Sequence, residues 1–86
     1  KEDNKPKEVV NIPMPVLQKG VEDHGTVLTI QALLREFGFT DDFGNTIPID
    51  GIFGEATEQA VKSYQTMRGL TVNGIVNEET WNRILK

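Results

Sequence analysis

The chain has 86 residues, of which 37% are hydrophobic and 26% charged, and its formal net charge is -4. This length allows one small domain, and the composition is that of a folded globular protein. The net negative charge argues against a nucleic-acid partner, and the nine Lys and Arg residues are too dispersed to bind an anionic membrane. Because cysteine is absent, disulfides, thiolate metal sites and cysteine nucleophiles are excluded.

Residues 1–15 combine many charges with prolines at positions 6, 13 and 15. Such a composition favours extended, solvated backbone. We interpret this segment as a linker from an upstream domain, or as an extended strap against the globular domain, which we expect over residues 16–86. No apolar run reaches the roughly 18 residues that a membrane span requires. Since the chain starts at Lys1 without a signal peptide, we expect it to be part of a longer protein.

The first helix is predicted from Thr26, where apolar residues recur at three- and four-residue spacing. The predicted buried positions are Val27, Ile30, Leu33, Leu34 and Phe37. Gly38 then provides a left-handed stop. Residues 40–49 contain Asp-Asp, Gly-Asn and a proline, which is typical of a loop with turns.

The second and third helices are predicted over 55–68 and from Glu78 onward. Gly69 ends the second helix, and Asn77 is the expected N-cap of the third. The predicted buried positions are Ala56, Ala60, Val61, Tyr64 and Met67, followed by Trp81, Ile84 and Leu85. The predicted fold is therefore all-α: a compact three-helix bundle with long connecting loops and an extended N-terminal linker.

One motif occurs twice, as Asp50-Gly-Ile-Phe-Gly-Glu-Ala-Thr57 and as Asn73-Gly-Ile-Val-Asn-Glu-Glu-Thr80. An Asx-Gly pair favours a tight turn, and Gly54 or Asn77 is placed to cap the helix that follows. We expect the isoleucine of each copy to insert into the core. The repeat is first of all a folding device.

The sequence does not support three catalytic or metal-binding interpretations. His24 and Ser63 lack the motif that exposes a nucleophilic serine. The loop acids Asp41, Asp42 and Asp50 with Asn45 do not have the spacing of a calcium-binding loop. A pair of catalytic carboxylates needs a deep cleft that raises one pKa, which so small a domain is not expected to form. We therefore predict no catalytic residue, no metal and no cofactor.

Taken in order, the motifs resemble the type 1 peptidoglycan-binding domain that accompanies bacterial and phage cell-wall hydrolases. The resemblance covers about residues 16–85 and rests on Leu17 through Gly20, Val27 through Gln31, Phe37-Gly-Phe39, Asp50 through Gln65, Gly69-Leu70 and Asn73 through Trp81. The chain departs from the family pattern at Ile30, Asn73 and Asn77, and in the long loop 40–49. The prodomain of animal matrix metalloproteases is similar too, but it uses a cysteine that is absent here.

The resemblance implies non-catalytic binding of peptidoglycan in the cell wall or outside the cell, next to an attached amidase, muramidase or peptidase. Aromatic rings, amides and a cation suit the sugars, peptide amides and carboxylates of this polymer. The candidate ligand-binding residues are Gln31, Asp50, Phe53, Tyr64, Gln65 and Arg68. Structural roles remain open for Tyr64 in the core and for Gln31 as a cap.

The alternative function is a protein-interaction or packing domain of a cell-envelope protein, which the long loop 40–49 would favour. A monomer is expected, because no apolar stripe is left over for a partner helix.

Overall fold

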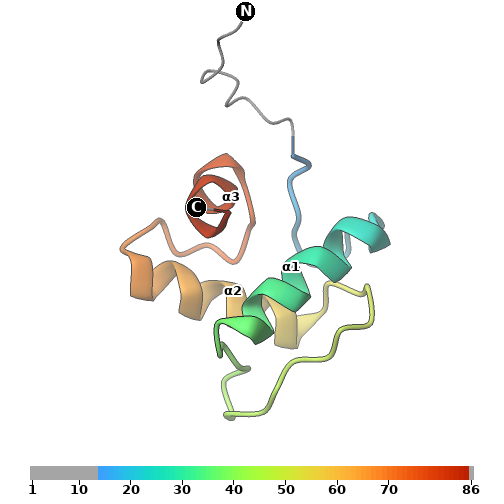
Figure 1. Cartoon of the computed structure of the whole chain (residues 1–86), viewed down its shortest axis with the longest axis horizontal. Coiled ribbons are helices and arrows are strands. Elements are labelled where there is room, and N and C mark those ends of the chain that lie inside the picture. Colours follow the sequence, from blue (N-terminus) through green and yellow to red (C-terminus); the bar gives the residue numbers. More distant parts are fainter. Residues whose placement is uncertain (1–13, 86) are drawn as a thin grey trace, which may run out of the picture.

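The computed structural model describes residues 14–85, so the predicted linker falls mostly outside the described residues. The chain forms three helices, α1 (His24–Glu36), α2 (Glu55–Arg68) and α3 (Glu78–Ile84). Figure 1 shows long connections between the helices. Within the described part no strand forms, and β pairing is limited to isolated antiparallel bridges. The prediction of an all-α three-helix fold is confirmed.

The helix ends follow the capping residues. Helix α1 begins at His24, earlier than predicted, because the Asp23 carboxylate accepts a hydrogen bond from the Thr26 N–H at 3.3 Å. Helix α3 has Asn77 as its N-cap, as predicted, and the Asn77 side chain accepts from the Thr80 N–H at 3.2 Å. Helix α2 ends at Gly69, whose left-handed φ of 72° suits a residue without a Cβ.

The core lies between the three helices. It also includes residues of the α1–α2 connection and of the α2–α3 connection. Its fully or nearly buried apolar residues are Leu17, Val27, Ile30, Leu34, Ile47, Phe53, Ala60, Val61, Tyr64, Val76, Trp81 and Ile84. Ile47 anchors the loop 40–49 to this core. The predicted burial of Trp81 is confirmed.

The predicted burial of three residues is wrong. Phe37, Met67 and Leu85 are 47%, 69% and 48% exposed. Phe37 and Leu85 are C-caps that follow the last helical turn, and Met67 lies in the last turn of α2. At these positions the apolar stripe of each helix extends beyond the part of the helix that neighbouring elements cover.

The repeated isoleucines are also placed differently from the prediction. Ile52 is 60% exposed and Ile75 is half-buried, whereas the residues that follow them, Phe53 and Val76, are buried. In each turn the isoleucine N–H donates to the side chain of the Asx residue two positions earlier. This contact leaves the isoleucine on the outer side of the turn, and the next residue points inward because side chains alternate in extended backbone.

The segment before α1 packs against the α2–α3 connection. Leu17 and Val76 exchange two backbone hydrogen bonds of 3.1 and 2.8 Å, and the Trp81 indole N–H donates to the Pro15 carbonyl at 2.8 Å. These contacts join residues far apart in the sequence and close the domain around α3.

Candidate functional site

Gln31, on the inner face of α1, holds the turn that leads into α2. Its Nε2 lies 3.1 Å from Asp50 Oδ1, 3.0 Å from the Ile52 carbonyl and 3.0 Å from Thr57 Oγ1. Its Oε1 accepts from the N–H groups of Asp50 at 3.0 Å and Gly51 at 2.9 Å. The side chain is fully buried, so the protein itself uses its hydrogen-bonding groups.

Gln65, on α2, repeats this arrangement at the turn that leads into α3. Its Nε2 lies 3.0 Å from each of Asn73 Oδ1, the Ile75 carbonyl and Thr80 Oγ1. Its Oε1 accepts from the N–H groups of Asn73 at 3.0 Å and Gly74 at 2.9 Å. The sequence repeat thus corresponds to a repeated hydrogen-bond network, in which each helix fixes the entrance of the next.

Asp50 is the charged member of the first turn. The Ile52 N–H, at 2.9 Å, and then the Gln31 amide donate to its carboxylate and hold the pKa of Asp50 below its ordinary value, while slight burial opposes this. Asp50 is exposed, but its oxygen Oδ1 is already engaged in the turn.

The six candidate ligand-binding residues do not share one surface. Gln31 and Asp50 belong to the turn before α2, and Gln65 belongs to the turn before α3. Gln31, Phe53, Tyr64 and Gln65 are each at most 2% exposed, whereas Asp50 and Arg68 are exposed. The structure therefore leaves Arg68 and Asp50 open to direct contact, and the ligand-binding role of the set stays a prediction.

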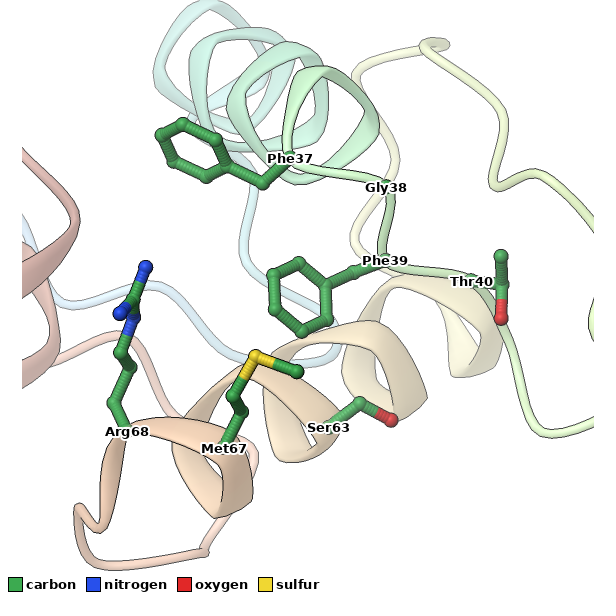
Figure 2. A pocket seen from close by; sticks show the side chains of 7 residues that line it. All are labelled: Phe37, Gly38, Phe39, Thr40, Ser63, Met67 and Arg68. Atoms are coloured by element: carbon green, nitrogen blue, oxygen red, sulfur yellow. The ribbon is translucent and has the colours of Figure 1, made fainter.

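A shallow groove of about 400 Å³ lies between the end of α1 and the C-terminal half of α2 (Figure 2). It is lined by Phe37, Gly38, Phe39, Thr40, Ser63, Met67 and Arg68. Figure 2 shows Phe37 and Arg68 reaching from the two helices toward the same space, with Phe39 and Met67 beside them. One of the predicted residues, Arg68, is thus in the groove.

Tyr64 supports this groove from within the core. The Phe39 ring packs edge-on against the Tyr64 ring, with centroids 5.4 Å apart and an interplanar angle of 79°. The Arg68 guanidinium carbon lies 5.6 Å from the centroid of the same ring, within cation–π range. A buried tyrosine therefore positions both an apolar wall and a cation.

The groove is lined by a positive charge and by no acid. None of its lining residues is Asp or Glu. Within residues 14–85, the ion pair that forms is Lys19 with Glu58, at 3.9 Å, and it involves no groove residue. Arg68 is therefore available to an anionic ligand.

Sequence reasoning missed the groove residues Phe37, Phe39, Ser63 and Met67 as binding candidates. Phe37 and Met67 were assigned to the core because they continue the apolar stripes of α1 and α2. The sequence offers one weak signal, which is that each stands at the C-terminal end of its helix, and this position does not by itself show which part of the stripe is covered.

A second hollow of about 420 Å³ is lined by Leu70, Glu79, Asn82 and Arg83, on and before α3. It is as shallow as the first, but its single apolar side chain is Leu70, and Glu79 places an acid beside Arg83. The first groove is therefore the better match to an uncharged or anionic ligand with apolar parts.

Comparison with known proteins places this geometry in a family. The chain is similar to a peptidoglycan-binding protein from Clostridioides difficile solved in complex with glutamine hydroxamate, with 31% identity and a TM-score of 0.71 over 81% of this chain and 40% of that one. It is also similar to the SleB N-terminal domain, with 30% identity and a TM-score of 0.72 over 83% of this chain and 89% of that one. The chain thus spans less than half of the first structure and most of the second.

No curated protein matches the sequence significantly. Among the described helices, none has both the length and the apolar character that crossing a bilayer requires. The profile of a family described as "Putative peptidoglycan binding domain" matches residues 23–84, which include all three helices and both glutamine-held turns. The chain therefore belongs to this peptidoglycan-binding domain family.

Proposed function

We propose that this domain binds peptidoglycan through the groove between α1 and α2, and that it thereby holds an attached cell-wall hydrolase on its polymer in the wall or outside the cell. Membership of the family supports the ligand. The single observation that carries the location is an apolar groove containing an arginine with no acidic lining residue. A tethered module raises the local concentration of its partner domain, so a weak site is sufficient.

The geometry supports binding in preference to catalysis. His24 begins α1 and Ser63 lines the groove at the opposite end of that helix. A helix of 13 residues is about 20 Å long at about 1.5 Å per residue, so these two side chains are not within hydrogen-bonding distance. The lowered pKa of Asp50 is also opposite to what a general acid requires.

Sedimentation with insoluble peptidoglycan stripped of teichoic acid tests this proposal. The 86-residue chain is expected to pellet with the polymer. Met67→Glu places an acid in the groove at a position that is 69% exposed, so it should abolish pelleting without unfolding the domain. Val72→Glu is the matched control, because Val72 is 50% exposed and lies outside the groove.

Pelleting of the Met67→Glu variant at the wild-type level would refute the groove as the site. If the folded wild-type chain stays in the supernatant, peptidoglycan binding by this domain is refuted. Circular dichroism of each variant shows whether the helices are intact.

A packing domain is the second candidate, favoured by one observation. Phe43, in the loop 40–49, is 83% exposed. Contact with another protein surface would bury this large apolar side chain, which the domain itself leaves in solvent. Loss of binding to the parent's remaining domains in a Phe43→Ser variant, with peptidoglycan pelleting unchanged, would assign that second role to the loop.

A further inference from the structure

We propose that the groove recognises the peptide part of peptidoglycan, and specifically a short peptide with small apolar side chains and a free terminal carboxylate that binds Arg68. This inference rests on the proposed function, since it names which part of the polymer enters the groove. It is argued from the chemistry of the lining residues, the placement of Arg68 and the charge of the rest of the molecule.

The lining of the groove suits a peptide better than a glycan. A sugar presents several hydroxyl groups, which need polar side chains at defined positions. The groove contains Ser63 and Thr40 as its side-chain hydroxyls, and the Thr40 hydroxyl already donates to the Asp41 carbonyl at 3.0 Å. The amides of Gln31 and Gln65, which could bind sugar hydroxyls, are buried in the turns. Phe37, Phe39 and Met67 instead offer apolar contacts for small side chains.

Arg68 is held in place to receive a carboxylate. A guanidinium can donate two parallel hydrogen bonds to a carboxylate, and such charge-assisted pairs are about twice as strong as neutral hydrogen bonds. The cation–π contact with Tyr64 restricts the Arg68 side chain over one end of the groove. Because fewer rotamers are lost on binding, the entropic cost of forming the pair is lower.

The acids of the chain lie outside the lining of the groove. The formal net charge of -4 repels an anion at long range, and Arg68 offsets this repulsion locally in a groove that no acid lines. A carboxylate-terminated peptide therefore has a distinct attractive position in the groove, next to Phe39 and Met67, where apolar side chains reduce competition from water.

The helices provide two matched controls. Arg35, Arg68 and Arg83 each lie in the last turn of a different helix, where a cation interacts favourably with the helix dipole. Replacing any of them by alanine removes the same charge from the same kind of position. Arg35 and Arg83 do not line the groove, so these two variants separate loss of stability from loss of the carboxylate contact.

Two ligand comparisons test the inference. In the first, NMR titration compares a synthetic peptide ending in D-alanyl-D-alanine, with its amines acetylated, with the same peptide as a C-terminal amide. We expect the free acid to bind at least tenfold more tightly than the amide, and Arg68→Ala to remove this preference. Arg68→Lys should recover part of it, and Arg35→Ala and Arg83→Ala should retain it.

In the second comparison, sedimentation uses intact peptidoglycan and, separately, glycan strands that an amidase has freed of their peptides and that are coupled to an insoluble resin. The chain is expected to pellet with the first polymer and not with the second. Equal pelleting with both polymers, or equal affinity for the acid and the amide, would overturn the peptide inference while leaving peptidoglycan binding in place. Absence of binding to intact peptidoglycan would instead refute the proposed function, and the peptide inference with it.

Discussion

Gln31 and Gln65 show how single buried side chains determine the shape of this domain. Each amide satisfies the N–H groups of an Asx-Gly turn and donates to a threonine hydroxyl at the start of the next helix. An unsatisfied buried polar group costs about 1–3 kcal/mol, so one glutamine that serves several groups contributes more than its own packing. These residues act on the groove by fixing the helices that form it.

Gln65→Ala is expected to destabilise the domain by about 3 kcal/mol, because it leaves the Asn73 and Gly74 N–H groups without their acceptor. Urea unfolding followed by circular dichroism measures this change. Gln59→Ala is the control on the same helix: Gln59 accepts one hydrogen bond, from the exposed Asp42 N–H, so its loss should cost about 1 kcal/mol or less. Equal losses in the two variants would show that the Gln65 network does not stabilise the turn.

Asp50 predicts a specific pH dependence. Because the pKa of Asp50 is lower in the folded state than in the unfolded chain, its ionised form adds stability above the ordinary pKa of about 3.9, and this contribution is lost as the pH falls through the folded-state value. In Asp50→Asn an amide oxygen can still accept from the Ile52 N–H, as Asn73 does from Ile75. The Tm of the wild type should therefore exceed that of the Asp50→Asn variant at pH 7, and this difference should shrink toward pH 2.

The reciprocal variant tests the same explanation. Asn73→Asp introduces a carboxylate into the second turn, where the same backbone donor is present. The stability of this variant should fall more steeply between pH 5 and pH 2 than that of the wild type. The reason is the same as at Asp50, namely that a carboxylate hydrogen-bonded in the folded state becomes protonated. Parallel pH profiles for all three proteins would contradict the assignment.

At the scale of the elements, the turns between helices impose stricter requirements than the helices themselves. Gly74 has a φ of 76°, and a Cβ built on it would lie 2.8 Å from Glu58 Cγ on α2. Gly69 has a similar φ of 72°, but a Cβ there would meet no atom within 4 Å. These two glycines therefore separate backbone strain from steric conflict.

Gly69→Ala is expected to lower the free energy of unfolding by about 1–2 kcal/mol, because alanine is strained in the left-handed backbone conformation. Gly74→Ala should cost more, because the Glu58 side chain must also move. Thermal unfolding of both variants measures the difference. Equal Tm values for the two would show that Glu58 moves aside without cost and that the turn does not press on α2.

The elements also show what the sequence could and could not predict. Apolar spacing and capping residues predicted three helices, and the bounds 55–68 of α2 agree with the structure. The periodicity could not show where the neighbouring helices stop covering a stripe, so Phe37 and Met67 were assigned to the core. For the same reason the groove that they line could not be located before the packing of α1 on α2 was known.

The structure places the candidate site residues in different environments, for a physical reason that the sequence does not show. Polar residues within an apolar stripe, such as Gln31 and Gln65, mark either a ligand contact or a buried hydrogen-bond network. A sequence does not distinguish these two cases, because the partners of Gln31 are backbone groups of a turn some twenty positions away in the chain. Arg68 was placed in the candidate set by its chemistry alone, and it does line the groove.

At the scale of the whole molecule, a small core leaves the groove between α1 and α2 and the hollow on α3 at the surface. The first described residues contact α3 through the Trp81–Pro15 hydrogen bond and the α2–α3 connection through the Leu17–Val76 bridge, so the two ends of the described chain lie together. The groove of α1 and α2 is not covered by this segment. The fold therefore uses one face for its own closure and leaves the groove face open.

The measurement that tests the central claim most directly is an NMR titration of the isotope-labelled chain with soluble peptidoglycan fragments that keep both sugar and peptide. The account predicts that the amide signals with the largest shifts belong to the residues that line the groove, which are Phe37 through Thr40, Ser63, Met67 and Arg68. Shifts concentrated instead at Leu70, Asn82 and Arg83, around the hollow on α3, would contradict it.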